Sequence, residues 1–268
     1  MSHRTLAYRP PDAPVHGTLF TPVTAAPSLA ALVIGGSGGS EPTYIAESLA
    51  KEGIAALSIA YFGRPGLPQA LSRVPIEYFL SALDVLRAEV PPGAKIATIG
   101  TSRGSEAAML AAIHSRHRVH AVVASVPTNV VAGSPDGGPA WLLDGEPLAW
   151  TERLGPAAND DAYIKVEEVQ GPVLLVAAGK DAIWPSAAMA RAISERLRIH
   201  GDLYGHVLLE YPEAAHSLGY LIPELPRDLL PPDLEDDPAT REARADAWPR
   251  VVEFLRQLTD SADQSTDL

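Results

Sequence analysis

The chain has 268 residues, of which 46% are hydrophobic and 20% are charged. This composition is ordinary for a globular protein, and the length suits one α/β domain over residues 1–268. The formal net charge of −12 opposes binding to nucleic acid or anionic membranes, since both depend on clusters of Lys and Arg. The N-terminus lacks the apolar core of a signal peptide, no apolar run reaches the ~20 residues that span a bilayer, and cysteine is absent. We therefore expect a cytoplasmic protein that binds neither nucleic acid nor membrane.

The predicted elements alternate along the chain. Residues 4–22 contain two short alternating segments on either side of a Pro-Pro-Asp turn, which predicts an antiparallel hairpin. Short apolar runs predict buried strands over 29–34, 54–59, 95–100, 119–124, 172–178 and 207–211. Apolar residues three and four apart predict helices over 43–53, 75–90, 102–115, 185–200 and 247–260. This order predicts right-handed crossovers and a mostly parallel sheet with helices on both faces.

Two segments interrupt the alternation. Residues 127–168 are rich in Gly, Pro and Asp and follow the end of a predicted strand. Long excursions of this kind are usually functional or mobile, and we interpret this one as a cap-like insertion. Residues 223–247 are acidic and rich in proline, which is typical of a solvated surface segment.

Two serines match the GxSxG pattern of serine hydrolases, Ser37 in GGSGG and Ser102 in GTSRG. In that pattern a strand ends at a sharp turn that carries the serine, and a helix begins at once. Ser102 fits, because a predicted strand precedes it and an alanine-rich helical sequence follows it directly. Its hydroxyl would lie at a helix N-terminus, where developing negative charge is favoured. After Ser37 a helix cannot begin before about Thr43, so we interpret Ser102 as the nucleophile.

The loop around Ser37 suits a different task. Backbone N–H groups of a glycine loop after an early strand can hold an oxyanion. We therefore predict that the N–H groups of Ser37 and Arg103 form an oxyanion hole, with Gly36 and Gly38 beside the substrate. Phosphate binding by this loop is the rival interpretation, but neither GxxxxGK[ST] nor GxGxxG is present.

The other members of a catalytic triad should follow Ser102 in the order acid, then histidine, at strand ends. Asp181 follows the predicted strand 172–178, and His216 follows the predicted strand 207–211. We predict that His216 is the base and that Asp181 orients it; a loop cap at Asp181 and a surface position for His216 are the alternatives. The histidines of HSRHRVH have no acidic partner nearby and predict no metal site. No cofactor is predicted.

Longer stretches resemble one known family. YFGRPGLPQALSRVPIEYF, IGTSRGSEAAMLAA, AWLLDGEPLAW and GPVLLVAAGKDAIWPSAAMARAISERL are similar to the C-terminal domain of the acyl-CoA thioesterase and bile acid-CoA:amino acid N-acyltransferase family, a branch of the α/β-hydrolases close to dienelactone hydrolase. The resemblance covers roughly residues 15–222. It implies the α/β-hydrolase fold and thioester chemistry at Ser102, with Asp181 and His216 as its partners. Members that transfer the acyl group to an amino acid carry Cys in place of Ser102, which favours water as the acceptor here.

The expected function is that of a serine hydrolase that cleaves a small-molecule acyl thioester, such as an acyl-CoA, through an acyl-enzyme. An ester or lactone hydrolase of the dienelactone type is one alternative. A non-catalytic binding protein on the same fold is another. The sequence leaves the acyl group and the oligomeric state open.

Several side chains are candidates for contact with the substrate. Arg64, together with Arg73 and Arg103, could supply a positive rim for anionic groups of the substrate. Trp141 and Trp150 in the cap-like insertion could line an acyl pocket, for which packing in the core is the alternative. Trp184 stands close to Asp181 in sequence, and packing is its alternative role as well.

Overall fold

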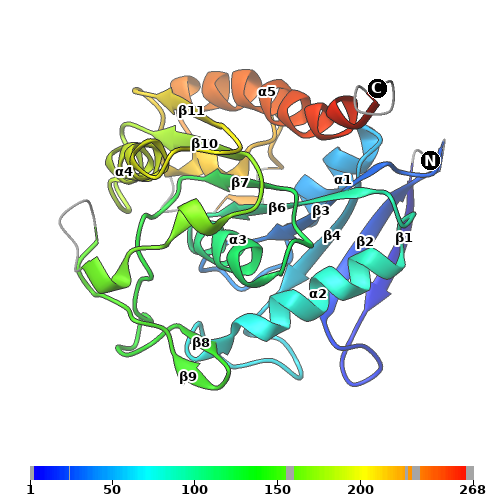
Figure 1. Cartoon of the computed structure of the whole chain (residues 1–268), viewed down its shortest axis with the longest axis horizontal. Coiled ribbons are helices and arrows are strands. Elements are labelled where there is room, and N and C mark those ends of the chain that lie inside the picture. Colours follow the sequence, from blue (N-terminus) through cyan, green and yellow to red (C-terminus); the bar gives the residue numbers. More distant parts are fainter. Residues whose placement is uncertain (1–2, 24, 155–159, 227–228, 231–235, 264–268) are drawn as a thin grey trace.

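The computed structural model describes residues 3–23, 25–154, 160–226, 229–230 and 236–263. An eight-stranded sheet in the order β1-β2-β4-β3-β6-β7-β10-β11 runs through the molecule, with helices on both faces (Figure 1). Its strands are β1 (His3–Tyr8), β2 (His16–Pro22), β3 (Leu29–Ile34), β4 (Ala55–Ala60), β6 (Lys95–Thr101), β7 (Ala121–Ser125), β10 (Val173–Ala178) and β11 (His206–Tyr211). Within this sheet β2 runs antiparallel to both of its neighbours, and the pairs from β4 to β11 are parallel.

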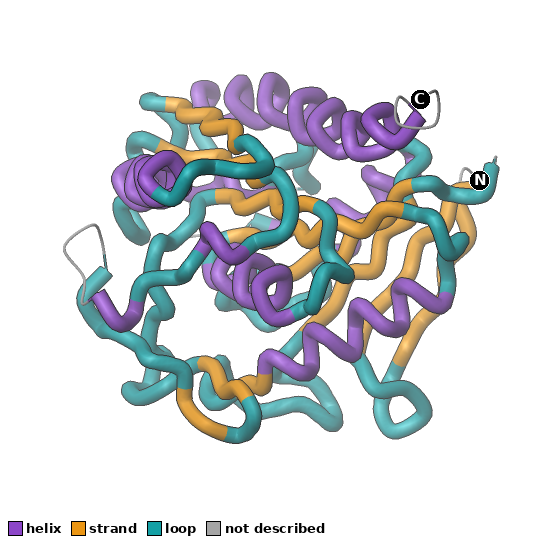
Figure 2. The backbone as a smooth tube through the Cα atoms, viewed as in Figure 1, coloured by secondary structure: helices purple, strands orange, loops and turns teal. Residues whose placement is uncertain are grey.

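The helices form two layers. They are α1 (Thr43–Lys51), α2 (Ile76–Ala88), α3 (Arg103–His114), α4 (Ser186–Ile199) and α5 (Pro238–Asp263). One apolar core lies between the sheet and the layer of α2, α3 and α4, and a second lies between the opposite face and the layer of α1 and α5. Figure 2 shows the strands gathered between these helices. The central strands are apolar on both faces because both faces are covered.

The predicted hairpin, the parallel sheet and its two helical layers are confirmed. The predicted strands and the first four helices begin and end within two residues of the observed bounds. Residues 29–34 illustrate why the prediction works: all six side chains of β3 are buried, so the run is apolar without alternation.

The start of the last helix differs from the prediction. We expected a helix over 247–260, whereas α5 begins at Pro238, inside the segment 223–247 that we interpreted as solvated surface. Thr240 and Arg244 in its first turns are buried despite the charged sequence around them. The helix starts early because Pro238 suits a first helical turn and because Arg244 finds partners in the protein interior. Residues 227–228 and 231–235 of that segment lie outside the described residues.

The segment predicted as a cap-like insertion, 127–168, carries two very short strands, β8 (Trp141–Leu143) and β9 (Glu146–Pro147). β8 pairs with β9 and with β5 (Val74–Pro75), which makes a second, three-stranded sheet beside α2 (Figure 1). Two short 3₁₀ helices, Asp160–Ala162 and Val166–Glu168, lead back to β10, and residues 155–159 lie outside the described residues. The segment is thus fastened to the main domain by strand pairing.

Candidate active site

Ser102 lies at the tight turn between β6 and α3. Its backbone has φ 55° and ψ −121°, a strained conformation for a residue with a side chain. The two flanking glycines are required by close packing: a Cβ on Gly100 would overlap the carbonyl of Gly104, and a Cβ on Gly104 would overlap the carbonyls of Ile34 and Gly35. The strand therefore ends against the helix with no room for side chains, which leaves the serine at the tip of the turn.

The structure brings the three predicted triad residues together in one chain of hydrogen bonds. Ser102 Oγ lies 3.1 Å from His216 Nε2. On the other side of the ring, His216 Nδ1 lies 2.8 Å and 2.9 Å from the two carboxylate oxygens of Asp181. With Nδ1 donating to the carboxylate, Nε2 is free to accept the serine proton. This is the order that a nucleophile, a base and an orienting acid require.

Asp181 is held in place by its own loop. Its Oδ1 accepts hydrogen bonds from the backbone N–H groups of Ile183 (3.0 Å) and Trp184 (3.2 Å). The carboxylate side chain is 1% exposed, so it meets His216 with little competition from water. Trp184 packs edge-on against the imidazole with the ring centroids 5.9 Å apart, and its indole N–H donates to the carbonyl of Val126. The acid is thus oriented before any substrate arrives.

His216 begins a short 3₁₀ helix, η3 (His216–Tyr220), which α5 and β6 hold from two sides. The Thr101 hydroxyl donates to the Gly219 carbonyl at 2.7 Å. Thr240 Oγ1 of α5 accepts the Ala215 N–H at 2.8 Å. These contacts connect the segment that carries the imidazole with the strand that carries Ser102.

Arg244 of α5 is a second support for this segment. Its Nε donates to the carbonyl of Ile222 at 3.0 Å, and its Nη1 donates to the carbonyl of Ser217 at 3.3 Å. The guanidinium also forms an ion pair with Asp236, at 2.6 Å. Sequence reasoning missed Arg244 because it lies in a run of charged residues, and only its spacing from Ala247 and Trp248, three and four residues further on, could have marked the buried side of a helix.

The predicted oxyanion loop lies against the turn that carries Ser102. A Cβ built on Gly36 would be 3.3 Å from the Cβ of Ser102, so the loop backbone approaches the serine closely. Ser37 lines the same cavity as Ser102. Gly38 is exposed at the tip of the loop. No helix follows Ser37 directly, since α1 begins at Thr43 as expected.

The Arg103 side chain is buried. It forms an ion pair with Glu106 (3.3 Å), donates to the carbonyl of Ala132 (2.9 Å) and lies over the ring of Trp141. Glu106 Oε1 in turn accepts the N–H of Ala132 (2.8 Å) and the indole N–H of Trp141 (2.5 Å). Burial raises the pKa of Glu106 to about 7, although Arg103 opposes this shift. This network ties the insertion to the first turn of α3.

A cavity of about 410 Å³ opens above Ser102, a size that suits a small organic substrate. The main domain contributes Ser37, Arg103 and Trp184 to its wall. The insertion contributes two groups of residues, Ala132, Gly133, Ser134, Pro135 and Gly137 in the first and Thr151, Glu152 and Leu154 in the second. Ser102, which lines this cavity, is 7% exposed. The insertion therefore forms part of the wall of the cavity that Ser102 lines.

The candidates for substrate contact divide into two groups. Of the three tryptophans, Trp184 lines the cavity, whereas Trp141 is fully buried in the core and Trp150 packs against Gly133. Arg64 and Arg73 are exposed and do not line the cavity. The sequence could not separate these cases, because a tryptophan in a loop is equally compatible with packing and with substrate contact.

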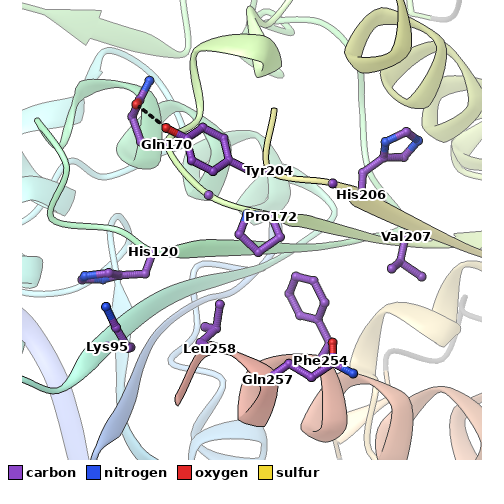
Figure 3. A pocket seen from close by; sticks show the side chains of 12 residues that line it. Lys95, His120, Gln170, Pro172, Tyr204, His206, Val207, Phe254, Gln257 and Leu258 are labelled. Carbon is purple, nitrogen blue, oxygen red and sulfur yellow. Dashed lines mark hydrogen bonds between the residues drawn. The ribbon is translucent and has the colours of Figure 1, made fainter. Parts of the chain in front are cut away.

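A second cavity, of about 490 Å³, lies at the opposite edge of the sheet (Figure 3). Lys95 and His206 begin β6 and β11 there, and Phe254 and Leu258 of α5 form its apolar side. Ligands of open α/β sheets bind at the carboxyl ends of the strands, and Ser102 lies at those ends, whereas this cavity lies at the amino ends.

In the parts of the chain that the structure describes, there is no cluster of three or more potential metal ligands. Over those same residues, no helix combines the length and the apolar character needed to cross a bilayer.

Comparison with known proteins supports the resemblance. Residues 149–226 match the family model "BAAT / Acyl-CoA thioester hydrolase C terminal". Rat mitochondrial acyl-coenzyme A thioesterase 2 is 29% identical over 221 residues, which cover 77% of this chain and 49% of that protein. Mouse acyl-coenzyme A thioesterase 6 is 29% identical over 273 residues, or 91% of this chain and 63% of that protein. The chain spans about half to two thirds of the length of these curated relatives.

Solved structures show the fold. A Klebsiella pneumoniae protein assigned as a dienelactone hydrolase has a TM-score of 0.64 at 19% identity and covers 91% of this chain and 93% of its own. A dienelactone hydrolase-like promiscuous phosphotriesterase from metagenomic libraries has a TM-score of 0.62 at 20% identity, covering 96% and 98%. The chain is therefore similar in sequence to the acyl-CoA thioesterases and to the C-terminal model of that family, and it has the α/β-hydrolase fold seen in dienelactone hydrolase-like proteins.

Proposed function

We propose that this protein is a serine hydrolase that cleaves acyl thioesters through an acyl-enzyme on Ser102. The observation that carries the proposal is the hydrogen-bonded series from Ser102 Oγ through the imidazole of His216 to the buried carboxylate of Asp181. Its position at the carboxyl ends of the parallel strands, below a cavity, supports the same conclusion.

The chemistry proceeds in two halves. Ser102 Oγ attacks the acyl carbon while His216 Nε2 takes the hydroxyl proton, and Asp181 stabilises the imidazolium that forms. The tetrahedral intermediate collapses as the bond from carbon to sulfur breaks and His216 donates its proton to the leaving thiolate. Water then attacks the acyl carbon of the acyl-enzyme while His216 Nε2 takes its proton. His216 returns this proton to Ser102 Oγ as the acid leaves. In both halves the N–H groups of Ser37 and Arg103 hold the oxyanion.

Thioesters are the leading substrate class because the family model and the curated relatives carry thioesterase names. Oxygen esters or lactones are the second candidate, and the charge of the cavity favours them. Among the described residues that line it, Arg103 is the one cation and is already paired with Glu106, while Glu152 adds a negative charge. The phosphates of a coenzyme A headgroup would find no free cationic partner in that wall.

The nucleophile is tested by labelling and substitution. A fluorophosphonate probe followed by peptide mass spectrometry should modify Ser102 and leave Ser37 unmodified. Ser102→Ala should abolish both labelling and turnover, whereas Ser48→Ala, which removes a hydroxyl from α1 away from the cavity, should change neither. Labelling of another residue, or full activity in Ser102→Ala, would contradict the proposal.

The substrate class is tested by kcat/KM on butyryl-CoA, p-nitrophenyl butyrate and a small lactone. We expect the thioester to be the best substrate relative to its uncatalysed hydrolysis. A clear preference for the oxygen ester or the lactone would instead support the dienelactone type. Absence of both turnover and labelling would indicate a binding protein on a hydrolase fold.

A further inference from the structure

Tyr61 is a buried residue just after β4 whose hydroxyl reaches the predicted oxyanion loop. Its Oη lies 3.0 Å from the carbonyl oxygen of Gly35 and 3.1 Å from that of Gly36, and the two carbonyls share its one hydroxyl proton. The residue is 1% exposed. Burial raises the pKa of Tyr61, so the phenol keeps its proton and remains a donor.

The ring of Tyr61 has little freedom to move. It packs against Phe62, Phe79 and Trp141, with ring centroids 5.1, 5.4 and 5.7 Å away, respectively. Trp141 is itself held by its hydrogen bond to Glu106. The hydroxyl is therefore a fixed point against which the loop backbone is positioned.

The orientation of one peptide unit follows from this contact. The Gly36 carbonyl and the Ser37 N–H belong to the same peptide bond, and in a trans peptide they point in opposite directions. In the described part of the chain the one cis bond is Pro10-Pro11, so the bond between Gly36 and Ser37 is trans. Because its carbonyl faces the Tyr61 hydroxyl, this peptide directs its N–H away from Tyr61, and Ser37 itself lines the same cavity as Ser102.

We propose that Tyr61 is a positioning residue: its hydroxyl fixes the Gly36–Ser37 peptide so that the Ser37 N–H faces the developing oxyanion. This inference rests on the proposed function and goes beyond it, because it names what keeps the donor in place. Glycine allows a wide range of backbone dihedral angles, so a loop with four glycines needs a contact such as this hydrogen bond to keep its peptide groups oriented during the reaction. Without the hydroxyl, this peptide can turn and present its carbonyl to the substrate.

The test is Tyr61→Phe, which removes one oxygen atom and keeps the ring. Tyr78→Phe is the matched control, because the Tyr78 hydroxyl donates to the carbonyl of Ala60 at 2.6 Å and does not line the cavity. Hydrolysis of p-nitrophenyl butyrate gives kcat and KM. A trifluoromethyl ketone, to which Ser102 adds to form a tetrahedral oxyanion, reports the stabilisation of that charge by its inhibition constant.

In Tyr61→Phe we expect kcat to fall about 10- to 100-fold, somewhat less than the 10²- to 10³-fold loss on removing an oxyanion donor outright. KM should change less than about threefold, and inhibition by the ketone should weaken by the same factor as kcat/KM. Tyr78→Phe should leave all three quantities within about twofold. Wild-type values in Tyr61→Phe, or a fall in kcat with unchanged inhibition, would overturn the inference.

Two further results keep the test decisive. If Tyr61→Phe does not fold, a crystal structure of the wild-type protein with the ketone decides: the oxyanion should lie about 3 Å from the Ser37 nitrogen, with the Gly36 carbonyl still on Tyr61. A carbonyl turned away from Tyr61 in that complex would refute the role. Full activity in Ser102→Ala would defeat the proposed function itself, whereas an inactive Ser102→Ala beside a normal Tyr61→Phe would defeat this inference alone.

Discussion

Glu106 offers a quantitative test of the buried network below the insertion. Its carboxylate is fully buried, and burial raises its pKa from 4.5 to about 7 even though Arg103, Trp141 and Ala132 favour the charged form. Between these two values the folded protein keeps the proton that the unfolded chain has lost. The stability that results is fully present below about pH 4.5 and is lost as the pH rises through about 7.

The magnitude follows from the two pKa values. One pH unit of difference corresponds to about 1.4 kcal/mol, so the contribution of Glu106 to the free energy of unfolding falls by about 3 kcal/mol in total. About 2 kcal/mol of this fall lies between pH 5.5 and 8. That range also lies above the sequence pI of about 5.1, where the net charge keeps the protein soluble.

The assay is urea unfolding of wild type and Glu106→Gln at fixed ionic strength from pH 5.5 to 8. As the pH rises from 5.5 to 8, the free energy of unfolding of the wild type should fall by about 2 kcal/mol relative to that of Glu106→Gln. Subtracting one free energy from the other cancels the contributions of His16, His114 and His120, whose lowered pKa values make stability rise with pH. Glu253→Gln, which removes one exposed charge from α5, should follow the wild type. Parallel curves for wild type and Glu106→Gln would show that Glu106 is ionised throughout and that the ion pair outweighs desolvation.

Three other substitutions probe the site. Gly104→Ala should prevent stable folding, because its Cβ meets backbone that cannot retreat, whereas Gly93→Ala meets open space; thermal melting compares the two. Asp181→Asn should keep the fold and lower kcat on the order of 10⁴-fold through loss of the correct His216 tautomer, as measured on p-nitrophenyl butyrate. Arg244→Met should cost about 2–4 kcal/mol in urea unfolding by leaving buried carbonyls without a donor, and it should lower kcat more than KM as His216 loses its support; unchanged kinetics would show that this support is dispensable.

The central part of the fold was predictable because its physical cause is local. Strands buried on both faces must be apolar throughout, as in residues 29–34, and a helix with one apolar stripe must repeat at 3.6 residues. The turn at Ser102 was predictable for a similar reason, since strand, glycines and helix follow one another in sequence. The placement of Asp181 and His216 needed only the rule that parallel strands end at one edge.

The features that the sequence did not reveal depend on contacts between distant segments. The small sheet of β5, β8 and β9 has strands of two or three residues, too short for any periodicity. The contact between Tyr61 and the Gly36 carbonyl joins residues 25 positions apart. The burial of the Arg103 side chain depends on Trp141 and Glu106, which pack around it.

The contacts between η3 and α5 mean that the segment with His216 reaches its final position only after α5 has folded. The loop with His216 is held by Thr101 of β6 and also by Thr240 and Arg244 of α5, which are translated later. A ribosome-bound chain that has emerged only as far as β11 thus contains Ser102 and Asp181 but lacks both His216 and the side chains of α5 that support it. We expect Ser102 of the nascent polypeptide to be unreactive toward a fluorophosphonate until α5 packs on the sheet. Labelling by this probe would then report that α5 has docked.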